Sequence, residues 1–220
     1  MFIARLFPAL RRWPIKTRYG PLVCDLSENV CLPLVMNGEY SHWRDEEPSL
    51  EALPLTDQSV VVDIGANIGV LTAWFARRAH EVHAFEPAPR ALELLRMNAP
   101  SNATIHPLAL GEESGLVRFT QAESLDMSAI SDSGIEVEIR TLDSYGLAPD
   151  LIKIDVEGFE PQVLRGARQT IARHRPLIMF EALSPDALAE CVAIIESIDP
   201  SYQVEAMGGR LNHLARHSAA

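Results

Sequence analysis

The chain is organised around a short apolar run that ends in a glycine turn. Val60 to Val62 are β-branched, Ile64 follows closely, and the chain then turns through Gly65–Gly69, with the sequence GANIG. A short apolar run ended by glycines fits a strand that is buried on both faces. A pattern of helical period follows at once in residues 70–76. The sequence therefore predicts a strand, a turn and a helix, the first unit of a nucleotide-binding parallel sheet.

The residues of this turn distinguish between two kinds of nucleotide. The dinucleotide motif G-x-G-x-x-G, started at Gly65, requires two further glycines where the chain has Asn67 and Val70. Asp63 would also face a pyrophosphate with like charge. S-adenosylmethionine has no phosphate, and its methionine end carries an ammonium, a sulfonium and a carboxylate that backbone N–H groups can bind. We therefore predict an S-adenosylmethionine site rather than a turn without a ligand, with these binding residues: Asp63, Gly65, Ala66, Asn67 and Gly69.

Composition and charge narrow the classes of function. The chain has 220 residues, of which 47% are hydrophobic, enough for one ordinary globular core. Its formal net charge of −11 argues against a nucleic-acid partner, for which a basic patch is expected. No apolar run reaches the length of a transmembrane helix, and Arg5 interrupts the apolar start too early for a signal peptide. We therefore expect a cytoplasmic protein that acts on a small molecule, a sugar or a peptide.

We predict an N-terminal extension over residues 1–50 and a cofactor-binding domain over residues 51–220. Residues 1–20 form a basic amphipathic segment, helical as far as Pro14, that could touch a membrane surface. A lid or a packing helix against the sheet or a second subunit is the favoured interpretation, so a homodimer is possible. Two apolar runs flank the polar residues 27–29 and predict a small hairpin. They are residues 22–26 and 30–32.

Two other features of the extension bear on the site. Asn37 and Gly38 are a strong turn signal, and the polar and aromatic residues after them could close over a cofactor or simply pack onto the domain. These residues include Tyr40, His42 and Trp43. Cys24 and Cys31 could face each other across the predicted hairpin, although a reduced pair is the favoured interpretation.

The second predicted strand, residues 81–86, ends in a carboxylate. Glu86 follows the first glycine of the turn by about 20 residues, the place where a carboxylate holds ribose hydroxyls. We therefore predict that Glu86 and the adjacent Pro87 bind the cofactor; the alternative is a solvated glutamate at a strand end. Residues 104–111 predict the third strand, whose last residues, Ala109 and Leu110, should lie beside the adenine.

Two later strands also end in carboxylates. Residues 150–155 end in Asp155, with Glu157 in the following turn, and residues 176–181 end in Glu181. Ligands of open α/β sheets bind at the carboxyl ends of strands, near the switch point in strand order. We therefore predict that Asp155 contacts the cofactor and that Asp155, Glu157 or Glu181 is the catalytic base. The preferred interpretation includes no metal, although carboxylates this close could bind a divalent cation.

The remaining pattern predicts the other elements. Residues 116–119 and 135–139 alternate at period two and predict half-exposed strands around a rim loop, residues 124–134. Lys153 lies within an apolar strand and requires a carboxylate partner, because an unpaired buried ammonium is costly. A helix is expected from Pro161 through Ile171, and glycines near position 208 predict a final antiparallel hairpin.

With these residues in view, the chain resembles the FkbM-type methyltransferases from about Val60 to Leu214. The resemblance is carried by VVDIGANIG, AFEP, RTLDSY, LIKIDVEGFEPQVLRGA and PLIMFEA. It implies the Rossmann-like class I methyltransferase fold: an α/β protein with a mostly parallel seven-stranded sheet and a C-terminal antiparallel hairpin.

The resemblance also implies S-adenosylmethionine as the cofactor and O-methylation of a hydroxyl on a small molecule, sugar or natural product. An N- or carboxyl-methyltransferase acting on a peptide or another small acceptor remains an alternative, as does a catalytically silent cofactor-binding homologue. An oxidoreductase with an ordinary dinucleotide site is disfavoured by Asn67 and Val70.

Overall fold

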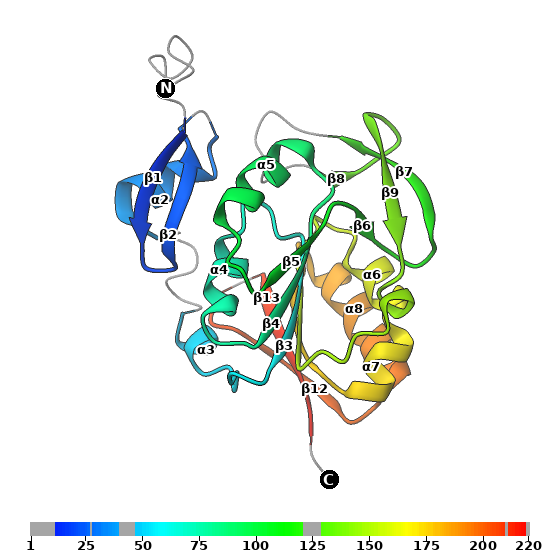
Figure 1. Ribbon diagram of the computed structural model, residues 1–220. Helices are drawn as coiled ribbons and strands as arrows, with labels where there is room; N and C mark the ends of the chain where they lie inside the picture. Colours follow the sequence, from blue (N-terminus) through cyan, green and yellow to red (C-terminus); the bar gives the residue numbers. More distant parts are fainter. Residues whose placement is uncertain (1–11, 27, 40–46, 121–128, 210, 219–220) are drawn as a thin grey trace.

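The computed structural model describes residues 12–26, 28–39, 47–120, 129–209 and 211–218. A small unit of two strands and one helix lies beside a larger α/β body (Figure 1). None of the described helices has the length and hydropathy of a membrane-spanning helix.

A seven-stranded sheet is the centre of the larger body, in the order β12-β13-β11-β10-β3-β4-β5. The five strands from β11 to β5 run parallel to one another, and β12 and β13 are antiparallel. This confirms the predicted mostly parallel sheet with a C-terminal antiparallel hairpin. The strands are β3 (Val60–Ile64), β4 (Glu81–Phe85), β5 (Ala103–His106), β10 (Leu151–Ile154), β11 (Leu177–Glu181), β12 (Tyr202–Ala206) and β13 (Asn212–His217).

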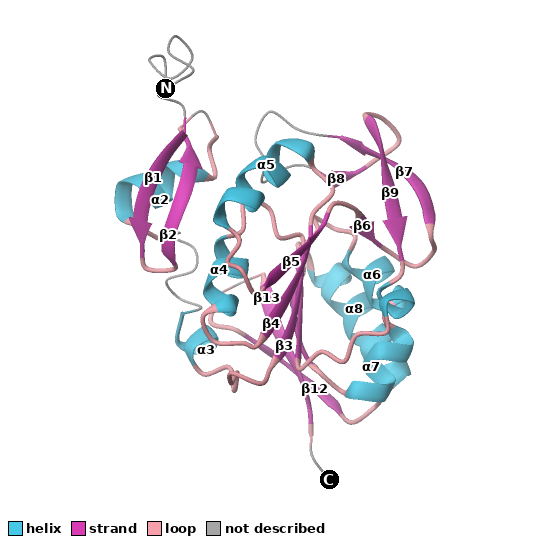
Figure 2. Ribbon diagram, viewed as in Figure 1, coloured by secondary structure: helices cyan, strands magenta, loops and turns pink. Residues whose placement is uncertain are grey.

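Helices cover both faces of this sheet, as Figure 2 shows. The side chains of β3 alternate between the two layers: Val61 packs in the cluster that includes α4, whereas Val62 and Ile64 pack in the cluster that includes α6 and α8. The predicted strand is therefore buried on both faces. The helices are α3 (Glu47–Glu51), α4 (Val70–Ala76), α5 (Pro89–Asn98), α6 (Glu160–Gly166), α7 (Arg168–His174) and α8 (Pro185–Ile198), with a short 3₁₀ helix, η4 (Leu142–Tyr145).

The helix predicted from Pro161 through Ile171 is in fact two helices. The first, α6, ends at Gly166, where an added Cβ would lie 1.9 Å from the carbonyl oxygen of Gly111. The backbone at Gly166 therefore contacts another loop directly, and the chain restarts as α7 at Arg168.

A second, smaller sheet has the order β6-β9-β7-β8. The single strand predicted over residues 104–111 was wrong: β5 ends at His106 and β6 starts at Ala109, in the other sheet. Pro107 lies between them and has no N–H to continue a ladder. The strands are β6 (Ala109–Leu110), β7 (Gly115–Thr120), β8 (Ala129–Ile130) and β9 (Ile135–Arg140). Of the predicted rim loop, residues 124–134, the first five lie outside the described residues, and Ala129 and Ile130 form β8 rather than a loop.

The extension differs from its prediction. Its strands are β1 (Arg12–Thr17) and β2 (Gly20–Asp25), which pair with each other, and its helix is α2 (Cys31–Asn37). The expected hairpin between residues 22–26 and 30–32 was therefore wrong, because the second run begins a helix. A short apolar run does not distinguish helix from strand. The expected helix up to Pro14 was also wrong for residues 12–14, which lie in β1.

The turn signal at Asn37 and Gly38 is the end of α2: Gly38 has φ +74°, and its N–H donates to the carbonyl of Leu34. Residues 1–11, and the predicted cluster of Tyr40, His42 and Trp43, lie outside the described residues. Cys24 and Cys31 are buried free thiols. The predicted boundary between an extension and a cofactor-binding domain near residue 50 stays a prediction. Cys24 and Cys31 of the extension pack in the same hydrophobic cluster as α4 of the larger body, so the two parts share a core.

Candidate active site

A cavity of about 750 Å³ opens where β3, β4, β10 and β11 end. This volume lies within the range of small-molecule sites. Ten of the residues predicted from the sequence line it: Gly65, Ala66, Asn67, Glu86, Pro87, Ala109, Leu110, Asp155, Glu157 and Glu181. Asp63, in β3, and Gly69, at the end of the turn, do not. The structure therefore brings the predicted residues together from segments far apart in the sequence.

The glycine turn after β3 is shaped by close contact with the end of β10. Gly65 has φ +75°, and a Cβ there would lie 1.8 Å from the carbonyl oxygen of Asp155. Asn67, with φ +50°, and Gly69, with φ +88°, are also left-handed. Asparagine tolerates this region better than most residues. Gly69 allows the turn to enter α4 and does not itself face the cavity.

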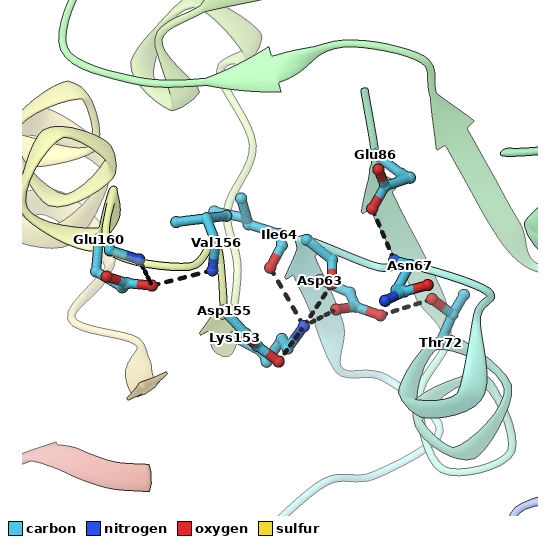
Figure 3. A network of polar contacts seen from close by, with 11 residues as sticks. Asp63, Ile64, Asn67, Thr72, Glu86, Lys153, Asp155, Val156 and Glu160 are labelled. Carbon is cyan, nitrogen blue, oxygen red and sulfur yellow. Dashed lines mark hydrogen bonds and ion pairs between the residues drawn. The ribbon is translucent and has the colours of Figure 1, made fainter. Parts of the chain in front are cut away.

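Beneath the turn, Lys153 holds the ends of β3 and β10 together (Figure 3). The two strands are in register at Lys153 and Asp63, and the Nζ lies 3.2 Å from Asp63 Oδ1 and 3.4 Å from Asp155 Oδ2. It also donates to the carbonyl of Gly65 at 2.7 Å. The carboxylate partner expected for Lys153 is thus confirmed, and there are two. Burial lowers the pKa of Lys153, but Asp155 and Asp63 outweigh it and the pKa is raised.

Asp63 is fully buried and supports the turn from below. Its second oxygen accepts a hydrogen bond from Thr72 Oγ1 at 2.6 Å, which links β3 to α4. Sequence reasoning placed Asp63 against the ligand. In the structure the carboxylate of Asp63 forms an ion pair with Lys153 instead, and Asp63 does not line the cavity.

Glu86 lies just after β4 and is held by two backbone donors. Its Oε2 accepts from the N–H of Asn67 at 2.8 Å, and its Oε1 accepts from the N–H of Ala88 at 2.7 Å. A carboxylate oxygen has a second lone pair, so both oxygens can accept further hydrogen bonds from the cavity. Burial raises the pKa of Glu86 to about 7.

Three acidic side chains meet at the ends of β10 and β11. One carboxylate oxygen from each of Asp155, Glu157 and Glu181 lies within 4.8 Å of the others. Burial, then the charges of Asp155, Glu157 and Glu160, raise the pKa of Glu181 to about 8. With this pKa Glu181 is mostly protonated at pH 7 and can donate a hydrogen bond, which favours Asp155 and Glu157 over Glu181 as the base. The same spacing would suit a divalent cation, the alternative that the sequence raised.

Sequence reasoning did not identify Glu160, which shapes the turn after β10. Its Oε1 accepts from the N–H of Val156 at 3.0 Å and of Gly158 at 3.2 Å, so it closes the turn that presents Glu157 (Figure 3). Glu157 itself has φ +56°, an unusual backbone for a residue with a Cβ. The sequence signal that could have identified Glu160 is its position at the start of the next helix, where a glutamate side chain can accept hydrogen bonds from the backbone of the preceding turn.

Three residues of the extension also line the cavity, and the sequence did not predict them. They are Asn29, Val30 and Pro33, around the start of α2. No spacing in the sequence indicates this contact, because it depends on how the extension packs against the larger body.

The sequence matches a known protein family over more than half of its length. The Methyltransferase FkbM domain matches residues 63–210. The chain belongs to the FkbM methyltransferase family. The predicted family and class of enzyme are thereby confirmed, and the match covers every predicted site residue.

Individual relatives agree with this assignment. The chain is 31% identical over 183 residues to 31-O-demethyl-FK506 methyltransferase FkbM of Streptomyces tacrolimicus, covering 62% of this chain and 70% of that protein. It is 31% identical over 124 residues to the hexuronic acid methyltransferase AglP of Haloferax volcanii, covering 50% of each. A solved structure of methyltransferase FkbM from Methylobacillus flagellatus KT has a TM-score of 0.59 and 26% identity, over 75% of this chain and 45% of that one. The chain thus spans only about half the length of two of these proteins.

Proposed function

We propose that the cavity binds S-adenosylmethionine and that the protein transfers its methyl group to a hydroxyl of a small molecule or sugar. The observation that carries the proposal is the meeting of Glu86 and the acidic group of Asp155, Glu157 and Glu181 in one cavity. The names of two relatives support the acceptor class: one is a 31-O-demethyl-FK506 methyltransferase and the other a hexuronic acid methyltransferase.

The shape of the cavity fits the proposed cofactor. A Cβ at Gly65 would collide with the carbonyl oxygen of Asp155, so the glycine lets the turn pack against the end of β10 and places Gly65 and Asp155 side by side in the cavity lining. Glu86 would accept hydrogen bonds from the two ribose hydroxyls. Ala109 and Leu110 would contact the adenine, and Asp155 and the turn from Gly65 to Asn67 would hold the methionine end.

When bound, S-adenosylmethionine supplies a methyl group on a sulfonium, which is already an activated leaving group. The chain's own residues therefore have two tasks: to orient the acceptor hydroxyl and to remove its proton. We assign proton removal to Asp155, with Glu157 as the second candidate. Glu181, protonated at neutral pH, would donate a hydrogen bond to the acceptor oxygen or to Asp155 and so orient either group.

Binding and methyl transfer test the two halves of this proposal separately. Calorimetry with S-adenosylhomocysteine on the folded protein should give a binding heat, and the absence of heat would contradict the cofactor assignment. Labelled S-adenosylmethionine should then label hydroxylated small molecules or sugars as alkali-stable methyl ethers.

The same assay distinguishes the alternatives. Label on peptide nitrogen or a carboxyl group alone would favour an N- or carboxyl-methyltransferase. Binding without transfer across broad panels would favour a silent homologue. Label confined to RNA would contradict the charge argument, since the chain carries a formal net charge of −11.

A further inference from the structure

The extension forms one wall of the cavity. Three of its residues face the cavity together with residues of the glycine turn and the start of α4. The extension residues are Asn29, Val30 and Pro33, and the residues of the larger body are Ile68, Val70 and Leu71. This part of the cavity wall is therefore present only while the extension is seated on the larger body.

One buried side chain of the larger body joins these two walls. Asn98, the last residue of α5, is 8% exposed. Its Oδ1 accepts from the N–H of Val23 at 2.6 Å, and its Nδ2 donates to the carbonyl of Val23 at 3.1 Å. The same Nδ2 donates to the carbonyl of Ile68, within the glycine turn, at 2.8 Å.

The backbone of β2 explains why an amide fits here. Val23 lies opposite Pro14 of β1 in the register of the hairpin, and its N–H and C=O both point away from β1 toward Asn98. The carboxamide of Asn98 therefore pairs with the outer edge of β2 as a neighbouring strand would. Proline suits the position opposite, because no ladder hydrogen bond is required from it there.

A second contact holds the extension to α5 from the outside. Glu28, which is 3% exposed, forms an ion pair with Arg90 of α5. Glu28 directly precedes the wall residues Asn29 and Val30. The extension is therefore tied to the same helix at two points, Val23 and Glu28, both of which precede the segment that lines the cavity.

We propose that Asn98 is a positioning residue for the ligand: its carboxamide holds the extension against the glycine turn and so determines the affinity of the cavity. This inference rests on the function proposed above. It assigns to the extension a direct part in binding, through an asparagine that does not itself line the cavity.

The expected effect follows from a population argument. If only the seated arrangement binds ligand, the apparent affinity falls in proportion to the seated fraction. Loss of the two Nδ2 hydrogen bonds to buried carbonyls should reduce that fraction to about one tenth, which gives about a tenfold weaker apparent affinity.

The test compares two matched substitutions, Asn98→Asp and Asn102→Asp. Asn102 lies four residues further on, and its Nδ2 likewise donates only to backbone carbonyls: those of Ala76, Ala79 and His80. None of these three hydrogen bonds involves the extension or the glycine turn. Each substitution keeps the size of the side chain and removes its donors, so both should lower thermal stability.

We expect Asn98→Asp to bind S-adenosylhomocysteine about tenfold more weakly by calorimetry, and Asn102→Asp to bind within about twofold of the wild type. Hydrogen exchange supplies the second measurement. Amides of β2 and α2 should exchange faster in ligand-free Asn98→Asp than in the wild type, and saturating S-adenosylhomocysteine should restore their protection.

Equal affinities for all three proteins would overturn the inference, as would equal weakening in both variants, which would indicate general destabilisation. If Asn98→Asp does not fold, Arg90→Gln weakens the same seating from the surface. Weaker binding in that variant supports the inference, and unchanged binding overturns it. A wild type that binds no S-adenosylhomocysteine would instead refute the proposed function.

Discussion

The affinity for S-adenosylhomocysteine should depend on the protonation of Glu86. Burial raises the pKa of Glu86 to about 7 in the ligand-free protein, so its carboxyl is largely protonated below that pH. A protonated carboxyl loses acceptor capacity on one oxygen, and ribose hydroxyls that bind the charged form must displace the proton. Binding should therefore weaken as the pH falls from 8 to 5.5.

The size of the effect can be calculated. If hydrogen bonds from the ribose return the pKa of Glu86 to its ordinary value of 4.5, binding at pH 5.5 displaces a proton held with a pKa of about 7. The dissociation constant then rises roughly 30-fold between pH 8 and pH 5.5, equivalent to about 2 kcal/mol. The contribution of Glu86 to the free energy of unfolding changes with pH in the opposite direction: it falls as the pH rises. A carboxyl whose folded pKa is raised contributes stability below its unfolded pKa and loses it as the pH rises through about 7, so acid does not unfold the protein through this group.

Calorimetry across this pH range, with Glu86→Gln as the control, measures the effect. At pH 8 the variant should bind more weakly by about 1.5–3 kcal/mol, the range for hydrogen bonds to a charged group. Its pH dependence should be smaller than that of the wild type by the Glu86 contribution. The nearby histidines do not imitate the effect. Burial lowers the pKa of His106 to about 4 and lowers that of His83 as well.

The reasoning is refuted if the wild-type affinity stays constant from pH 8 to 5.5. It is also refuted if Glu86→Gln retains the full wild-type slope, since another group would then be the origin of the pH dependence.

Three further predictions concern the groups around Lys153 and the turn. Asp155→Asn should lower methyl transfer by about 10²–10⁴-fold with a folded protein by circular dichroism, and full turnover would exclude it as the base. Gly65→Ala should cost at least about 3 kcal/mol in urea unfolding because its Cβ would lie 1.8 Å from a carbonyl oxygen, whereas Gly115→Ala, with nothing within 4 Å, should stay within about 0.5 kcal/mol. Equal stability of the two variants would contradict the close contact. Lys153→Met should cost about 3–5 kcal/mol by leaving Asp63 buried and unpaired, and adding Asp63→Asn should recover part of that loss; no recovery would contradict the pairing.

The sequence correctly predicted those elements whose pattern of apolar and polar residues matches their burial in the folded protein. The run from Val60 to Ile64 reads as a buried strand because both of its faces are covered by helices. Glu86 was found because its spacing from the turn follows from the length of one helix and one strand. Lys153 was recognised as needing a carboxylate, but its partner required the register of β10 on β3, which local sequence does not contain.

The errors arose where contacts distant in sequence decide the local structure. The apolar residues that begin α2 have no strong preference between helix and strand, and the larger body covers one face of them as a helix. The division between β5 and β6 follows from Pro107, yet only the second sheet shows where the chain goes next. The contribution of Asn29 and Val30 to the cavity depends on docking through Asn98, a residue in an otherwise ordinary helix.

The seating of the extension also constrains the order in which the protein can fold. The hydrogen bond between Val23 and Asn98 joins residues 75 positions apart, and β2 makes its contacts with α5 across the same separation. During synthesis the extension is made first, but the helix on which it docks is complete only after β3, α4 and β4 have been made. Contacts of such long range form slowly, since the entropy of closing the loop must be lost before they are made. The extension should therefore be among the last elements to gain protection in a refolding experiment, and the part of the cavity wall formed by Asn29, Val30 and Pro33 should be completed only at that step.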